Sequence, residues 1–174
     1  PVDRTVEILR AARARGWRTA KFYFMIGFPL EGGDREAEEI IELLEYTGRA
    51  TGMSLNVNVA TFIPKPHTPF QWARQLGEQE ALDQITKVRR ALPRGRFKVG
   101  YHAPFTSVLE GIVSRGDERV GDLVLAAYRA GARLDAWEER IQWDLWRSAI
   151  ASAGWDVIGE SLRARALDEA LPWD

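Results

Sequence analysis

Residues 21–44 read KFYFMIGFPLEGGDREAEEIIELL, and this stretch decides which fold the sequence predicts. It begins with an apolar run, passes through a turn rich in glycine and proline, and continues as a helix. The run at residues 19–28 is too uniformly apolar for a half-exposed strand, so it predicts a parallel strand covered on both faces. A strand, loop and helix in this order usually present a ligand-binding loop at the carboxyl end of the strand.

The segments around this unit repeat the alternation. The first helix has Asp3 as its expected N-cap and Gly16 at its end. The expected order is a helix at 3–16, a strand at 19–28, a helix at 34–51, a strand at 54–64, a helix at 78–91 and a strand at 97–103. Helix-length crossovers between strands predict a parallel α/β fold. Three strands leave open edges, so the pattern predicts about half of a barrel or of a doubly wound sheet.

The sequence pattern changes after residue 103, where helices separated by glycine turns are expected. We therefore predict a first domain over residues 1–103 and a helical segment over 104–174. Trp137, Trp143 and Trp146 recur at spacings that can share one helical side, which favours core packing. Acidic neighbours of these tryptophans count against a platform for stacking nucleic-acid bases.

Composition narrows the classes of function. The 174 residues carry a formal net charge of -1, so no general basic field indicates a nucleic-acid partner. No apolar stretch reaches the roughly 20 residues of a membrane span, and no secretory signal is present. The lack of cysteine excludes disulfides, a thiol nucleophile and cysteine-ligated clusters, and is compatible with a cytoplasmic location. His67 and His102 lack the spacing of a metal site. The ends lack an initiator methionine and a polar tail, so we expect a piece of a longer protein.

The loop of residues 27–33, GFPLEGG, could cradle a phosphate with its backbone N–H groups. The following helix begins with several acidic residues, which would repel a polyphosphate and already satisfy the helix dipole. A neutral or cationic ligand against Gly27 and Pro29 fits better, and a tight turn without a ligand remains the plain alternative.

Two further segments could contribute to a ligand pocket. The strand at 54–64 alternates apolar residues with Asn56 and Asn58, which predicts one polar-lined face and makes both asparagines ligand-contact candidates. The segment PKPHTPF at 64–70 is stiffened by three prolines and carries Lys65 and His67. Lys65 could pair with a carboxylate or phosphate and His67 could move a proton, although both could equally be structural residues.

Polar residues also gather on the expected helix and turn SVLEGIVSRGDERVGD at 107–122. A network of arginines and carboxylates that ties the turn together is the simplest interpretation. The residues concerned are Ser107, Glu110, Ser114, Arg115, Asp117, Arg119 and Asp122.

Taken together, three segments resemble one family. These are FYFMIGFPLEG, ATFIPKPHTPFQWA and YHAPFTSVLEGIVSRGDERVGDLVLAAYRAGARLDAWEE, followed by the closing LDEALPWD. They resemble cobalamin-binding radical SAM proteins of uncharacterised function, over nearly the whole chain and in the same order. The resemblance implies the second half of a partial (β/α)6 radical SAM TIM-like barrel, followed by a helical extension.

The resemblance also implies cofactors. In the superfamily a [4Fe–4S] cluster, held by a Cys-x3-Cys-x-x-Cys loop, cleaves S-adenosylmethionine to a 5′-deoxyadenosyl radical that abstracts hydrogen from the substrate. Ile26, Gly27, Phe28 and Pro29 match the segment that flanks the adenine, and Glu31 matches the same motif. Related enzymes often read Gly-Phe-Pro-Gly-Glu-Thr there, and the departures at residues 30 and 32 put the backbone path of this loop in question. Cobalamin would belong to the full-length parent.

This chain lacks the cluster cysteines, so we expect no catalytic residue within it and no activity from it alone. The expected partner is the missing N-terminal half of the barrel, or a second copy meeting the open sheet edges. The alternative is a non-catalytic α/β interaction module derived from a radical SAM barrel. An upstream Cys-x3-Cys-x-x-Cys in the gene would favour the enzyme, and a natural start just before Pro1 would favour the module. A phosphate-binding barrel fragment is weakened by the acidic helix start.

Overall fold

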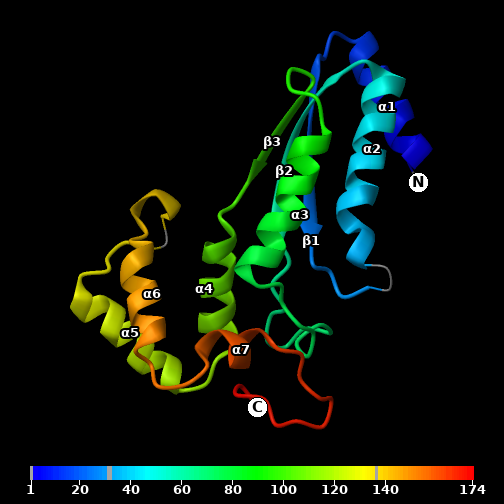
Figure 1. Ribbon diagram of the computed structural model, residues 1–174. Coiled ribbons are helices and arrows are strands. Elements are labelled where there is room, and N and C mark those ends of the chain that lie inside the picture. The colour runs from blue at the N-terminus through cyan, green and yellow to red at the C-terminus, as the bar shows by residue number, and fades with distance from the viewer. Residues whose placement is uncertain (1, 31–32, 136) are drawn as a thin grey trace. The chain divides into compact units, whose positions relative to one another are not determined.

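The computed structural model describes residues 2–30, 33–135 and 137–174, and Figure 1 shows its helices and strands. The described chain forms two compact units. The first, called here the sheet unit, comprises Pro1–Phe62 and Glu78–Pro104. The second, the helical unit, comprises Ile63–Gly77 and Phe105–Asp174. Residues 63–77, which lie within the first expected domain of residues 1–103, are part of the helical unit in this division.

The sheet unit alternates helices and strands in the expected order. Its elements are α1 (Val2–Ala14), β1 (Thr19–Ile26), the 3-10 turn η1 (Gly33–Arg35), α2 (Glu36–Thr51), β2 (Ser54–Thr61), α3 (Glu78–Ala91) and β3 (Phe97–Tyr101). The strands form one parallel sheet in the order β1-β2-β3. The α/β class and the parallel pairing are therefore confirmed. Asp3 lies inside α1 and is not its N-cap.

Local sequence explains where these elements end. Gly52 has a φ of 64° and closes α2 by donating its N–H to the carbonyl of Gly48. A left-handed residue at this position favours glycine because a Cβ would be strained there. The third helix has the predicted bounds, since Pro93 cannot continue a helix and Gly95, at a φ of 104°, turns the chain toward β3.

Helices cover one face of the sheet. Leu55, Val57 and Val59 of β2 are buried beneath them. Gly48 of α2 lies so close to the ring of Phe97 in β3 that an added Cβ would meet Cζ at 2.9 Å. Leu55 is the register partner of Phe97, so both point to this covered face. The apolar half of each strand therefore forms the core between the sheet and its helices.

The helices of the sheet unit leave the opposite face of the sheet uncovered, which corrects one expectation. We expected β1 to be buried on both faces, but its exposure alternates along the strand. Tyr23 is 67% exposed and Met25 is 53% exposed, whereas Ile26 is fully buried. The physical reason is that the helices of this unit pack on the other face only, so alternate residues of β1 meet solvent.

The helical unit contains α4 (Pro104–Arg115, whose first residue lies at the boundary), α5 (Arg119–Ala130), the 3-10 turn η2 (Glu138–Arg140), α6 (Trp143–Ala151) and α7 (Val157–Leu162). Its core is built from apolar residues of α4, α5, α6 and α7. The tryptophans differ in environment: Trp146 is buried in this core, Trp143 packs against it and Trp137 is 61% exposed. The prediction that all three share the core is wrong for Trp137, because the chain is not one continuous helix over 137–146.

The segment 63–77 is held in the helical unit by hydrogen bonds. Gln75 is fully buried, and its backbone N–H donates to the carbonyl of Leu162 over 2.9 Å. Its side-chain Nε2 donates to the carbonyl of Ser107 over 2.7 Å. Farther along the chain, Arg165 donates its N–H to the carbonyl of Trp72 over 2.9 Å. The connection from β2 to α3 is therefore bound to the helical unit by backbone and side-chain hydrogen bonds.

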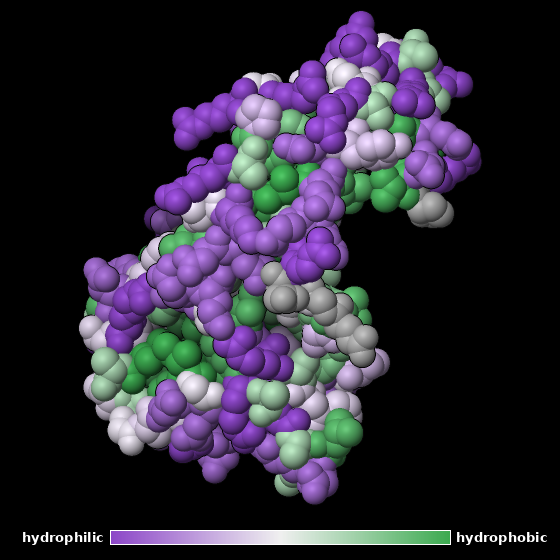
Figure 2. Space-filling view, turned by 45° about the vertical axis from the view of Figure 1, so that its right-hand side comes forward, coloured by the Kyte–Doolittle hydropathy of each residue, from purple (hydrophilic) through white to green (hydrophobic). Residues whose placement is uncertain are grey.

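The surface mixes polar and apolar side chains. Figure 2 shows hydrophilic residues over much of the face that it draws, with several separate apolar areas between them. Among the described residues, none of the helices combines the length and the hydrophobicity needed to cross a membrane.

Candidate functional site

The predicted adenine-flanking residues form the end of β1 and the turn that follows it. Ile26 is buried, Gly27 has a φ of 78°, and Phe28 is half-buried, while Pro29 is exposed. A positive φ is accessible to glycine and strained for other residues, so Gly27 lets the chain turn sharply where the strand ends. Glu31, the fifth predicted residue of this group, lies outside the described residues.

Glu36, the first residue of α2, fixes this turn. Its carboxylate accepts the backbone N–H of Gly27 at 2.5 Å and that of Phe28 at 2.9 Å. Two charge-assisted bonds to one carboxylate hold consecutive peptide groups in place. The same bonds occupy the two N–H groups that a phosphate would otherwise use. The expectation that acidic residues make this loop a poor phosphate cradle therefore gains a direct structural reason.

Aromatic packing supports the turn from the neighbouring strand. The ring of Phe28 meets that of Phe62 edge to face, with 4.7 Å between the centroids. Phe62 follows β2, and its backbone N–H donates to the carbonyl of Ile26 over 2.8 Å. These contacts extend the sheet pairing beyond the strands and give the turn one apolar wall.

Asn56 and Asn58 lie on the uncovered face of the sheet. The register pairs Asn56 with Lys21 and Asn58 with Tyr23 across β1, so these four side chains share one face. On β3 their partners are Lys98 and Gly100, and a Cβ on Gly100 would lie 3.5 Å from Oδ1 of Asn58. Lys21 lies over the ring of Tyr23, with 4.8 Å to the centroid. The predicted polar-lined face of β2 is confirmed.

Lys65 and His67 belong to the helical unit and not to the sheet unit. Lys65 forms an exposed ion pair with Glu110 of α4. The exposed His67 has a φ of 57°, and its backbone N–H donates to Oε1 of Gln71 over 2.9 Å. Thr68 donates its hydroxyl to the carbonyl of Lys65. These contacts tie Lys65 and His67 to their neighbours within the helical unit.

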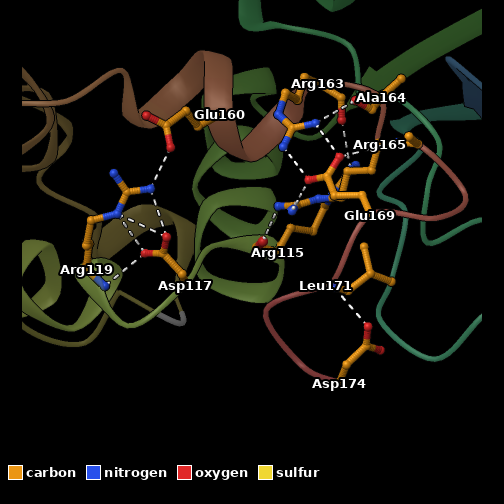
Figure 3. A network of polar contacts seen from close by, with 11 residues as sticks. Arg115, Asp117, Arg119, Glu160, Arg163, Ala164, Arg165, Glu169, Leu171 and Asp174 are labelled. Atoms are coloured by element: carbon orange, nitrogen blue, oxygen red, sulfur yellow. Dashed lines mark hydrogen bonds and ion pairs between the residues drawn. The ribbon is translucent and has the colours of Figure 1, made fainter.

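A second group of polar residues surrounds a pocket of about 220 Å³ in the helical unit. The charged residues that line this pocket, which we call the arginine pocket, are Asp117, Arg119, Glu160, Arg163, Arg165 and Glu169. Figure 3 shows how they lie. Asp117 and Arg119 belong to the arginine–carboxylate network that the sequence predicted, and they are in contact. The sequence gave no sign of the four charged residues near the C-terminus.

Two ion-pair clusters make up the walls of the arginine pocket. Arg119 donates to both oxygens of Asp117, at 2.8–3.0 Å, and to Glu160 at 2.5 Å. Arg163 pairs with both oxygens of Glu169 (Figure 3). The arginine hydrogen bonds lower the pKa of Asp117 and lower that of Glu169 to about 2, so both carboxyl groups are ionised at neutral pH.

Arg115 lies behind these clusters and is fully buried. Its Nη2 donates to the carbonyl of Arg163 over 3.0 Å, and its own carbonyl accepts from Nη2 of Arg165 over 2.8 Å. Burial lowers the pKa of Arg115 to about 10, and the positive charges of Arg165 and Arg163 add to this effect. The lower pKa therefore reflects mainly the loss of solvent around this cation.

No site for a metal ion emerges from the acidic and histidine side chains within the described ranges, where no three of them come together. The sequence also supplies no cysteine anywhere along the chain.

Comparison with known proteins shows a distant similarity to a curated archaeal protein. The chain is 29% identical over 109 residues to "Uncharacterized protein MJ0966" of Methanocaldococcus jannaschii. The match covers 63% of this chain but only 24% of the relative, so the chain spans about a quarter of the protein it resembles. No family model matches the chain, and no solved structure matches it.

Proposed function

We propose that the sheet unit is part of a radical SAM barrel and forms one wall of its S-adenosylmethionine pocket. The proposal assigns Ile26, Gly27, Phe28 and Pro29, with Glu31, to the adenine side. One observation carries it: a parallel sheet with helices on one face ends in a fixed, partly apolar turn, and its open face carries the two asparagines of β2.

The open face supports a pocket-lining role. In a barrel of parallel strands the helices cover the outside, and the side chains of the inner face line the interior. Here Asn56 and Asn58 stand on the face that the helices leave uncovered, beside Tyr23 and Lys21. Amides in such a row can each donate and accept hydrogen bonds, which suits a polar substrate. We propose Asn56 and Asn58 as substrate-pocket residues, and Lys65 and His67 remain candidates for the same role.

The residues of the turn fit the adenosyl group better than a nucleotide phosphate. Glu36 already accepts the N–H groups of Gly27 and Phe28, so the turn presents the apolar surfaces of Phe28 and Pro29. An adenine can lie against such surfaces. The neighbouring carboxylates of α2 favour a cation, and S-adenosylmethionine carries a sulfonium charge and no phosphate.

The residues present do not fit the cluster. The chain has no cysteine, so it supplies no thiolate ligand to a [4Fe–4S] centre. When bound in the parent enzyme, the cluster would supply the electron that cleaves S-adenosylmethionine. We therefore propose that the chain acts with a further segment of polypeptide that completes the barrel and carries the Cys-x3-Cys-x-x-Cys loop. The parent would be a cytoplasmic radical SAM oxidoreductase or transferase, with cobalamin as an additional candidate cofactor, and this chain alone would not be catalytic.

Two reconstitution experiments test the proposal. The gene product that joins this chain to the cysteine loop should, with iron, sulfide, reductant and S-adenosylmethionine, release 5′-deoxyadenosine. The 174-residue chain treated in the same way should gain no iron–sulfur absorbance and release none. Either signal from a clean preparation of the short chain would overturn the proposal, as would the lack of product from the complete protein with its cluster in place.

A substitution tests whether Phe28 contacts the adenine of S-adenosylmethionine. In the complete protein, Phe28→Ala should weaken S-adenosylmethionine binding roughly tenfold, because a stacked ring contributes about 1–3 kcal/mol to the binding of a base. Leu30→Ala is the matched control, since Leu30 is a 65% exposed neighbour in the same turn. Cluster absorbance should be unchanged in both variants. Equal affinities for the two variants would exclude Phe28 from the site.

A further inference from the structure

Two residues that line the arginine pocket, and the buried arginine behind it, carry hydrogen-bond donors without acceptors. The Ser161 hydroxyl, which is 1% exposed, and Nε of Arg165 both belong to residues that line the pocket. Behind them, Nε and Nη1 of the fully buried Arg115 are also hydrogen-bond donors. Within the described residues none of these four donor atoms has a hydrogen-bond partner.

Such donors are costly to bury. Leaving one donor unsatisfied costs about 1–3 kcal/mol, and more when the group is charged. Native proteins satisfy the great majority of buried polar groups, with protein atoms, ordered water or an ion. Several unsatisfied donors around one pocket therefore point to a ligand that accepts hydrogen bonds.

The charges around the pocket favour an anion. Three arginines and three carboxylates line it, and they balance. Each carboxylate already accepts hydrogen bonds from an arginine: Asp117 and Glu160 from Arg119, and Glu169 from Arg163. Arg115 behind the wall adds one positive charge that no carboxylate contacts within the described chain. The positive charge of Arg115 and the unsatisfied donors therefore both favour binding of an anion.

We propose that the arginine pocket binds a single oxyanion group, a phosphate or a carboxylate, of a small molecule. The Ser161 hydroxyl and the Nε–H of Arg165 donate to the oxyanion, and the charge of Arg115 stabilises it from behind. Charge-assisted hydrogen bonds of this kind are about twice as strong as neutral ones.

The dimensions of the pocket limit the ligand to a small group. Its volume of about 220 Å³ lies below the roughly 300–1,000 Å³ of sites that enclose a drug-sized molecule. Trp155, with the guanidinium of Arg119 stacked 4.0 Å above its ring, forms one rigid wall. The pocket therefore suits an oxyanion headgroup, with the remainder of the molecule outside it.

Titration calorimetry and thermal unfolding in chloride buffers of matched ionic strength test this inference with the probes inorganic phosphate and acetate. At least one probe should bind the protein and raise its melting temperature, and the stronger probe identifies the chemical source of the oxyanion. If neither binds more tightly than chloride, the inference is overturned.

Substitutions assign the binding to these residues. Ser161→Ala should weaken the preferred anion roughly tenfold, because it removes a hydrogen bond to a charged group. The melting temperature without anion should stay the same or rise, since the lost hydroxyl has no partner within the described chain. The matched control is Ser148→Ala on the exposed side of α6. Equal affinity in the two serine variants would overturn the assignment.

A charge-matched pair gives a second readout. Arg163→Gln should also weaken the preferred anion, whereas Arg129→Gln removes the same charge from an exposed position near the end of α5 and should leave the affinity unchanged. Equal losses in both variants would show a general charge effect and contradict a defined pocket.

Discussion

At the scale of single residues, Glu36 shows how one side chain can fix the backbone of a loop by hydrogen bonds. Its two oxygens accept two consecutive backbone N–H groups, from Gly27 and Phe28. The sequence showed an acidic helix start and predicted repulsion of phosphate. It did not reveal that one of these carboxylates bonds the loop itself, because Glu36 lies nine positions after Gly27 in the chain.

The first prediction concerns this carboxylate. Glu36→Gln keeps one acceptor oxygen and replaces the other by an NH2 group, which cannot accept from a backbone N–H. One partly buried donor then loses its partner, and the free energy of unfolding should fall by about 1 kcal/mol. Urea denaturation measures the change.

Glu39→Gln serves as the control for this prediction. Glu39 lies in the same first turn of α2 and is exposed, so its neutralisation changes the helix dipole interaction in the same way. Equal losses in the two variants would mean that the dipole, and not the hydrogen bonds to the loop, accounts for the effect.

At the scale of elements, sequence and structure agree on features that are determined by residues close together in the chain. Parallel strands with helical crossovers were predictable, because apolar runs, turn residues and helix ends are local signals. The bounds of α3 followed from such signals. The exposure of Tyr23 was not predictable, since it depends on which face of the sheet the helices cover.

The same limit explains what was missed in the candidate sites. Asn56 and Asn58 share a face because their spacing along one strand dictates it. The arginine pocket, by contrast, joins residues 115–119 to residues 160–169. No local pattern in the sequence shows that these segments meet, and the burial of Arg115 is a property of the folded unit alone.

The second prediction concerns the packing of α4 against the segment 63–77. A Cβ at Gly111 would lie 2.8 Å from Cδ and 2.9 Å from Nε2 of Gln75, and Gln75 is fully buried. Gly111→Ala should therefore lower the free energy of unfolding by about 1–3 kcal/mol, through overpacking. Thermal or urea unfolding gives this value.

A helical glycine without neighbours provides the contrast. Around Gly121 of α5 nothing described lies within 4 Å of an added Cβ, so Gly121→Ala should stabilise the protein by about 0.5–1 kcal/mol through helix propensity. Combining Gly111→Ala with Gln75→Ala should recover part of the loss, since the clash needs both side chains. Strict additivity of the two changes would contradict the proposed contact.

At the scale of the whole molecule, the sheet formed by the described residues has two edge strands, β1 and β3. Its open face exposes Tyr23 and Met25 beside polar side chains. Unpaired edges and apolar surface favour association with another chain. The proposal that a further barrel segment completes this sheet gives that surface a partner. When the protein is purified without such a segment, two copies are expected to associate through the same surface.

The third prediction tests this association. Sedimentation velocity should show a concentration-dependent dimer, and Met25→Lys should weaken it at least tenfold by placing a charge on the open face, where Met25 is 53% exposed. Val124→Lys, on the exposed side of α5, is the control and should leave dimerisation unchanged. A monomer at all concentrations, or equal weakening by both substitutions, would contradict association through the sheet.

The position of residues 63–77 has a consequence for how this protein can evolve. The chain leaves the sheet unit after Phe62, returns to it at Glu78 and leaves it again after Pro104. A single crossover between genes therefore cannot exchange one whole unit for another, because part of the helical unit is encoded inside the sheet. Domain shuffling would separate Gln75 from the α4 backbone that it contacts. The two units are expected to be inherited, duplicated and lost together, as one genetic module.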